Sequence, residues 1–251
     1  MNCLFGGDQL RVIYYHRVVE DGVPTDIREP GMFVTRAAFD AQIRHLKDRY
    51  CAVSEDQVVA AVNGKSKLPE KAVWVTFDDG YKDNFTLGYP VLKKYGVPAT
   101  FFVTTGYLNG QFFPADFKAA RDLFMTWDDV CSLSRDGFAI GAHTVSHPSA
   151  RQLSEAELER EVADSKKEIE QRVGITVRSF AYPFGKQINV DAVIGTPVLK
   201  RNGLELAVTT SGGVNKDIVA GRYEVKRFGA SSRDNMLKFW IKVAFSGAWQ
   251  T

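Results

Sequence analysis

The sequence has few cysteines, no long apolar segment and no excess of charge of either sign. Its three cysteines, Cys3, Cys51 and Cys131, are far apart and odd in number. This excludes a disulfide scaffold and leaves no CxxC pair for metal binding or redox chemistry. No run reaches the roughly 18 apolar residues that a membrane-spanning helix needs. The 32 Lys and Arg against 30 Asp and Glu leave a net charge of +2, which gives no support for a nucleic-acid partner.

The first residues lack the features of a secretory leader. Met1–Asp8 has neither a basic segment nor an apolar core. We therefore expect a cytoplasmic or membrane-peripheral protein. If the chain is a processed form, the expected location is extracytoplasmic instead.

Short β-rich segments alternate with helical patterns along almost all of the 251 residues. Alternation of this kind predicts an α/β fold with a parallel sheet, either open or closed into a barrel. No linker, charge block or repeat divides the chain, so we expect one domain over residues 1–251 with its core at about residues 10–230. The predicted strands are Leu10–Tyr15, Ala72–Phe77, Thr100–Thr104, Phe138–Ala142, Ser179–Tyr182, Leu206–Thr209 and, last, Tyr223–Phe228.

Several helices have readable start or stop signals. Capping boxes begin at Ser154 and Thr126, and Gly174 is the expected stop of the first of these helices. A helix over Ala37–Tyr50 places its apolar residues at helical spacing. A further helix starts near Tyr89-Pro90 and ends at Gly96-Val97-Pro98, and Asp21–Gly31, which has two prolines, is predicted as a loop.

Two adjacent carboxylates, Asp78 and Asp79, follow the predicted strand Ala72–Phe77 directly. Parallel sheets and barrels build their sites at the carboxyl ends of strands, so this is the expected place for chemistry. One aspartate could hold a metal while the other faces a water. Taken alone, Asp-Asp-Gly is more typical of a helix cap than of a site.

Two of the four histidines, His143 and His147, follow the predicted strand Phe138–Ala142. Their i, i+4 spacing would put both imidazoles on one side of a helical turn, within reach of one metal ion. The alternative is a pair of hydrogen-bonded histidines in a polar loop. A third strand end, Phe180–Gly185, has no acid or base and taken alone indicates a turn.

Together these strand ends supply two imidazole nitrogens and one carboxylate, from His143, His147 and Asp79. Three protein ligands with open positions describe a catalytic metal rather than a structural one. Asp78 is then placed to take a proton from a water beside that ion.

The chain resembles the polysaccharide deacetylase family, also called the NodB-homology or family 4 carbohydrate esterases. Thr76–Gly80 matches the family's TFDDG motif, and His143–Pro148 matches its H-[ST]-x-x-H-P motif. Tyr95–Val103 is also similar, and Phe180–Gly185 stands in place of the third motif. The similarity runs from about Val12 to Arg227. Tyr14–Val18, whose last four residues read YHRV, resembles the branch that acts on poly-N-acetylglucosamine.

The resemblance implies a distorted (β/α) barrel of about seven or eight parallel strands that removes acetyl groups from an N-acetylated amino sugar. The substrate would be a polysaccharide or a lipid-linked glycan. Asp79, His143 and His147 would bind one divalent metal ion, usually zinc and in some relatives cobalt or nickel, and Asp78 would be the general base. Phe184, with Tyr182 beside it, would contact the oxyanion or the substrate.

The chain departs from the family pattern at two positions. Many relatives orient the base with an Arg where this chain has Ala181, and they carry a late Leu-x-His whose imidazole is the general acid. No histidine follows His147, so we expect His16, at the end of the first strand, to be the acid. The alternative for His16 is a structural histidine. Arg17 or Arg227 could replace the missing Arg, and the sequence does not choose between them.

The missing Arg and late His favour one alternative, a catalytically impaired glycan-binding homologue. Hydrolysis of another non-peptide C–N bond, in a formamide or cyclic imide, is a second. The apolar stretch Asn235–Phe245 is predicted to close the barrel, with contact to a membrane surface as the other interpretation. Trp127, Tyr107 and Phe112–Phe113 are candidates for a sugar groove. The glycan, the native metal and the oligomeric state are left open.

Overall fold

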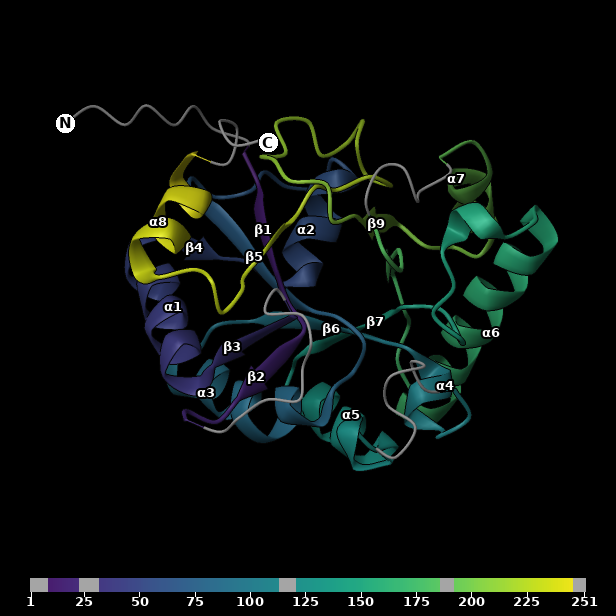
Figure 1. Ribbon diagram of the computed structural model, residues 1–251. Coiled ribbons are helices and arrows are strands. Elements are labelled where there is room, and N and C mark those ends of the chain that lie inside the picture. The colour runs from purple at the N-terminus through teal and green to yellow at the C-terminus, as the bar shows by residue number, and fades with distance from the viewer. Residues whose placement is uncertain (1–8, 23–31, 113–120, 186–191, 246–251) are drawn as a thin grey trace.

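We describe the protein from a computed structural model, which defines residues 9–22, 32–112, 121–185 and 192–245 (Figure 1). The main sheet consists of β1 (Arg11–Tyr15), β4 (Cys51–Ala52), β5 (Ala72–Phe77), β6 (Ala99–Val103), β7 (Ala139–Ala142), β8 (Ser179–Ala181), β9 (Leu206–Val208) and β10 (Phe228–Gly229). A separate pair consists of β2 (Arg17–Val19) and β3 (Phe33–Thr35). The helices are α1 (Arg36–Arg49), α2 (Glu55–Val62), α3 (Tyr89–Tyr95), α4 (Thr105–Leu108), α5 (Trp127–Arg135), α6 (Glu155–Val173), α7 (Ala192–Arg201) and α8 (Met236–Phe245).

The main sheet is parallel and curls back on itself. Its strands follow the order β10-β1-β5-β6-β7-β8-β9, with β4 beside β5. The segment 225–229 joins the two ends of this path, because Val225 bridges to Val208 of β9 while Phe228 pairs with Ile13 of β1. The eight strands therefore form a distorted barrel, which confirms the predicted fold class.

The two faces of the sheet form different cores. Trp74, Phe102, Ala181 and Val208 come from four strands and pack together on the inner face, where α2 also contributes. Their sequence neighbours point the other way, as the alternation of a strand requires, and pack against the helices that surround the sheet (Figure 1). This alternation decides which residues at a strand end face the barrel mouth.

The predicted helix signals are confirmed. Thr126 and Ser154 both make capping boxes, with Asp129 and Glu157 as their partners. Gly96 and Gly174 end α3 and α6 in the left-handed conformation, which glycine adopts without steric cost.

Other elements differ from the prediction. The sequence reading did not identify α2, whose capping box is Ser54 with Gln57, or α7, which holds Pro197 in its interior. It also missed the pair β2–β3, and the expected strand Tyr223–Phe228 is reduced to a bridge at Val225 and the two residues of β10. Of the predicted loop Asp21–Gly31, residues 23–31 lie outside the described residues.

The C-terminal helix α8 packs on the barrel, as the favoured interpretation predicted. Phe239 and Val243 are fully or almost fully buried, and the Arg11 side chain donates to the Val243 carbonyl at 2.8 Å. Its other face exposes Met236, Leu237 and Trp240, and contact of that face with a lipid surface stays a prediction. Among the described residues, none of the helices has the length and apolar character to cross a membrane.

Gly141 of β7 provides a test of the inner packing. A methyl group added there would lie 2.4 Å from two ring atoms of Phe102 and 2.9 Å from the Ser179 hydroxyl. Forcing extra volume into a packed core costs about 1–3 kcal/mol. Gly141→Ala should lower the free energy of unfolding by that amount in urea titrations. Gly212→Ala, where the methyl meets nothing within 4 Å, should leave stability unchanged; equal stability of both variants would contradict this packing.

Candidate active site

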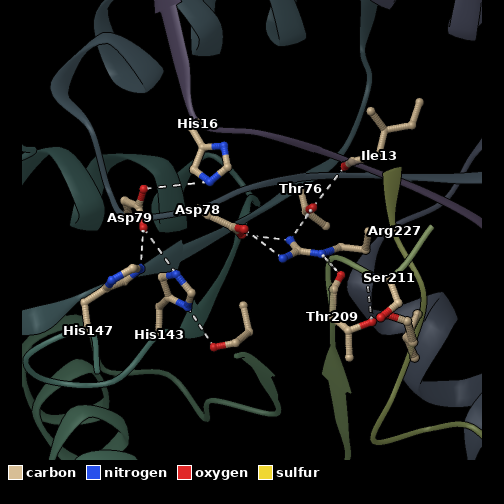
Figure 2. Close-up of polar contacts among 12 residues, drawn as sticks. Ile13, His16, Thr76, Asp78, Asp79, His143, His147, Thr209, Ser211 and Arg227 are labelled. Atoms are coloured by element: carbon tan, nitrogen blue, oxygen red, sulfur yellow. Dashed lines mark hydrogen bonds and ion pairs between the residues drawn. The ribbon is translucent and has the colours of Figure 1, made fainter. Parts of the chain in front are cut away.

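Asp78 faces the barrel interior because it continues the alternation of β5. Trp74 and Thr76 lie on the same inner face, and the Asp78 N–H still donates to the Tyr15 carbonyl of β1 at 3.0 Å. The next residue, Asp79, has a φ of 73°, in the left-handed region. The two adjacent carboxylates therefore point in different directions, as Figure 2 shows.

Asp78 forms a buried ion pair with Arg227. Two guanidinium nitrogens donate to the two carboxylate oxygens at 2.7 Å each, and the Arg227 side chain is fully buried (Figure 2). Two further N–H groups donate to the Thr76 hydroxyl at 3.0 Å and to the Thr209 carbonyl at 2.8 Å. Burial alone would raise the pKa of Asp78, but the charge and hydrogen bonds of Arg227 outweigh it and hold this pKa below its ordinary value. Asp78 is thus ionised at neutral pH.

Of the two arginines that the sequence left open, Arg227 is the one that contacts Asp78. Arg17 instead donates to Asp83 at 2.7 Å, and Asp83 also accepts the Val18 N–H. A sequence signal for the choice exists in the last predicted strand, where Arg227 shares the inward parity of Val225. A lone arginine on the inner face of a barrel strand requires a buried anion.

Asp79 lies between the two histidines of the second motif. Its Oδ1 is 3.2 Å from Nε2 of His143 and 3.1 Å from Nε2 of His147, and the imidazole rings are 4.8 Å apart. The three candidate ligand atoms lie within 4.8 Å of one another. The sequence therefore identified residues that the fold brings together.

The loop from His143 to His147 is not the helical turn that their spacing suggested. Thr144 and His147 both have positive φ, 66° and 60°, and neither is in a helix. Such a conformation costs about 1–2 kcal/mol for a residue with a Cβ. The Thr144 hydroxyl compensates in part by accepting the His147 N–H at 3.0 Å. Irregular backbone, rather than a helix, aims both imidazoles at Asp79.

The hydrogen bonding of these residues fits a cation. Nδ1 of His143 is 2.7 Å from the Ala181 carbonyl and so carries a proton, which leaves a lone pair on Nε2 when the ring is neutral. That lone pair faces Asp79 Oδ1, a buried oxygen that has no hydrogen-bond partner among the described residues. Two electron-rich atoms at this distance require a proton or a metal ion between them. Two imidazoles and one carboxylate are ligands that zinc, cobalt and nickel accept.

His16 lies on the opposite side of Asp79 from the other two histidines (Figure 2). Its Nε2 is 4.0 Å from Asp79 Oδ2, and the Asn84 side chain holds its backbone carbonyl at 2.6 Å. Burial lowers the pKa of His16 despite the charges of Asp79 and Asp78, so the ring is neutral at pH 7. The remaining histidine, His45, was expected to be solvated. It instead packs between Tyr50 and Phe239, with its Nε2 buried.

The two residues of the third strand end are placed differently from each other. Phe184 has a φ of 55°, is 57% exposed, and its ring lies 4.8 Å from that of His147. Tyr182 is 1% exposed and packs edge-on against Phe180 in the outer core. Strand alternation explains this, because Ala181 takes the inward position. The structure thus brings the Phe184 ring to the site, whereas the Tyr182 side chain is almost completely buried and its hydroxyl oxygen is inaccessible.

The aromatics suggested for a sugar groove are mostly enclosed. Tyr107 is 6% exposed, and Trp127 donates its indole N–H to Asn109 and packs under the Arg172 guanidinium. Phe112 is 44% exposed, and Phe113 lies outside the described residues.

Comparison with known proteins identifies the family. The model of the polysaccharide deacetylase family matches residues 65–207, more than half of the chain, and the protein belongs to that family. The Bacillus subtilis (strain 168) protein YxkH, whose name also places it among polysaccharide deacetylases, is 26% identical over 87% of this chain and 70% of its own length. The poly-β-1,6-N-acetyl-D-glucosamine N-deacetylase of Staphylococcus aureus (strain MSSA476) is 27% identical over 68% of this chain. This chain spans 59% of the length of that relative.

Solved structures agree with the fold. The de-N-acetylase from Aggregatibacter actinomycetemcomitans superposes with a TM-score of 0.79 at 27% identity, over 94% of this chain and 100% of that one. The Streptococcus pyogenes deacetylase PplD superposes with a TM-score of 0.80 over 95% of this chain and 99% of that one. At 24% identity, this second likeness concerns the fold alone.

Proposed function

We propose that this protein is a metal-dependent N-deacetylase that hydrolyses the N-acetyl group of an amino-sugar glycan and releases acetate. The observation that carries the proposal is the pairing of two unlike carboxylates. Asp79 lies between the imidazoles of His143 and His147. Asp78 is adjacent to it in the sequence, is ionised, and forms a buried ion pair with Arg227. Poly-β-1,6-N-acetyl-D-glucosamine, the polymer named for the staphylococcal relatives, is the first substrate to test.

In this proposal Asp79, His143 and His147 hold one divalent ion, zinc before cobalt or nickel. When bound, such an ion polarises the amide carbonyl and lowers the pKa of a water beside it. Asp78 takes the proton from the attacking water, and Arg227 keeps its carboxylate in one orientation. A backbone N–H at Phe184 is the proposed donor to the oxyanion that forms. The exposed Phe184 ring forms one wall beside His147.

His16 is the proposed general acid for the leaving amine. Its imidazole is neutral at pH 7, so it must gain a proton before it can donate one. The proton that Asp78 removes from water is the natural source, because both side chains border Asp79 (Figure 2). The C–N bond then breaks, acetate leaves and the sugar keeps a free amine.

Acetate release tests the proposed function directly. The purified chain, loaded with zinc or cobalt, should release acetate from chito-oligomers, peptidoglycan or poly-N-acetylglucosamine. Release should stop when a chelator removes the metal and return when zinc is added. Absence of acetate from every N-acetylated glycan, with the metal bound, would overturn the proposal. Formate release from a formamide would then favour hydrolysis of another C–N bond.

We expect His16→Ala to lower kcat by about 10²–10⁴-fold, the usual contribution of a general acid. Zinc content should stay at the wild-type level, because the three ligands are untouched. The matched control is His45→Ala, since His45 packs on Phe239 of α8 and has no role in the proposed reaction. A His16→Ala rate equal to wild type across the pH range would remove His16 from the mechanism.

A further inference from the structure

The loop that carries the two histidines is tied to α6 by one carboxylate. The backbone N–H groups of Val145 and Ser146 donate to Oε2 of Glu161 at 2.8 and 2.9 Å. The Ser146 hydroxyl donates to Oε1 at 2.6 Å. Hydrogen bonds to an ionised acceptor are roughly twice as strong as neutral ones. Val162 and Ser165 of the same helix are fully buried, so the element that presents this carboxylate is fixed in the core.

The loop depends on such ties because neither a helix nor a strand holds it. Thr144 and His147 are both left-handed, on either side of the two residues that Glu161 binds. On the opposite side, the Gly106 N–H donates to the Val145 carbonyl at 2.9 Å, and the Thr105 N–H donates to the Thr144 carbonyl at 3.2 Å. The loop is therefore clamped between the start of α4 and Glu161.

We infer that Glu161 is a positioning residue for the metal site, acting through the backbone of residues 145 and 146. No hydrogen bond or ion pair joins Glu161 to either histidine in the described part of the chain. Its effect is to hold the two left-handed residues so that both imidazole Nε2 atoms converge on Asp79. The inference rests on the proposed function, because it presumes that Asp79, His143 and His147 bind a divalent ion.

Zinc affinity, measured by competition with a chromophoric chelator, tests this role. Glu161→Ala should weaken zinc binding by about 10–100-fold, the range found when outer partners of metal ligands are removed. Glu161→Gln should show a smaller loss, because one amide oxygen can still accept both backbone N–H groups. The matched control is Asp164→Ala, which removes an exposed carboxylate from the same helix and should bind zinc as wild type does.

Thermal unfolding with and without zinc separates positioning from general stability. A merely structural residue would lower both melting temperatures equally. For Glu161→Ala we expect the rise in melting temperature caused by zinc to shrink more than the zinc-free value falls, since ligand stabilisation follows affinity.

Two results would overturn the inference in different ways. If wild type binds zinc and both Glu161 variants bind it equally well, Glu161 has no positioning role. If wild type binds neither zinc nor cobalt, the proposed metal site fails and the inference fails with it. Should Glu161→Ala not fold, Glu161→Gln decides, because wild-type affinity in that variant contradicts the role.

Discussion

Asp78→Asn should lower the rate of acetate release by about 10²–10⁴-fold while leaving zinc bound. The amide cannot take the proton of the attacking water, so the chemical step loses its base. The three proposed ligands should keep their positions, since the hydrogen bonds and ion pairs of the Asp78 carboxylate in the described residues go to Arg227 and not to them. The measurement is kcat on an N-acetylglucosamine oligomer, together with zinc content by mass spectrometry of the same sample.

The matched variant for this experiment is His143→Ala, which removes one of the three proposed ligands. It should lose zinc and activity together, whereas Asp78→Asn should lose activity alone. The contrast separates a base from a ligand within one pair of measurements. Undiminished activity of zinc-replete Asp78→Asn would refute the role of Asp78, and loss of zinc from that variant would make Asp78 part of the metal site instead.

Arg227→Met should produce the second large effect, because it leaves a buried carboxylate without its cation. In wild type the pKa of Asp78 lies below its ordinary value, so the base is ionised until the pH falls through that lowered pKa. Without Arg227 the contribution of burial dominates, and the pKa of Asp78 rises. The acid limb of the kcat/KM profile should therefore move to higher pH. Any contribution of a bound metal ion is common to both proteins, so the shift between them reports Arg227.

The same variant should lose stability in a pH-dependent way. A lowered folded-state pKa stabilises the wild type above the unfolded pKa of Asp, and this stability is lost as the pH falls through the folded value. In Arg227→Met the pKa of Asp78 should lie above its unfolded value, which reverses the pH dependence. The free energy of unfolding of this variant should therefore fall as the pH rises through the pKa of Asp78. Breaking a buried ion pair costs about 3–5 kcal/mol. Urea unfolding at pH 5.5 and 8 should show the larger difference from wild type at pH 8.

Arg178→Met is the control for this pair of effects. Arg178 bonds Glu55 at 3.2 Å, beside the start of β8 rather than at the strand ends that carry the site. Its loss should lower stability without moving the acid limb. Two results would contradict the proposal that Arg227 keeps the pKa of Asp78 low. One is an acid limb of the kcat/KM profile at the wild-type pH in Arg227→Met, and the other is an equal shift of that limb in Arg178→Met.

The sequence predicts the barrel well where a strand is both buried and apolar. Ala72–Phe77 was predicted with the bounds that β5 has, because a run rich in apolar and β-branched residues is typical of a strand buried on both faces, and all six residues are buried. The pair β2–β3 has three residues in each strand, which is too short for a periodic signal. Helix α7 was missed for another reason: Pro197 in its interior is a residue that sequence rules treat as a stop.

The candidate site was predictable to the extent that its residues follow strands. Asp78, Asp79 and His143 come directly after β5 or β7, and His147 follows in the same loop as His143, so the parallel topology brings these segments to one edge of the sheet. Arg227 is 149 residues from Asp78, and Glu161 is on α6, 16 residues from Val145, so no motif of adjacent residues links either of them to its partner. Tyr182 was misplaced because its neighbour on the strand, Ala181, takes the inward position.

The closing segment 225–229 makes the order of synthesis matter for this site. The residues that match the family motifs lie between positions 76 and 148, yet the guanidinium that completes Asp78 comes from position 227. A nascent chain that has reached only Val208 already contains both motifs, but it lacks the segment that closes the barrel and the guanidinium that pairs with Asp78. The buried ion pair therefore forms late, with the segment that bridges β9 to β1, and a chain released before that point would carry the motifs without it.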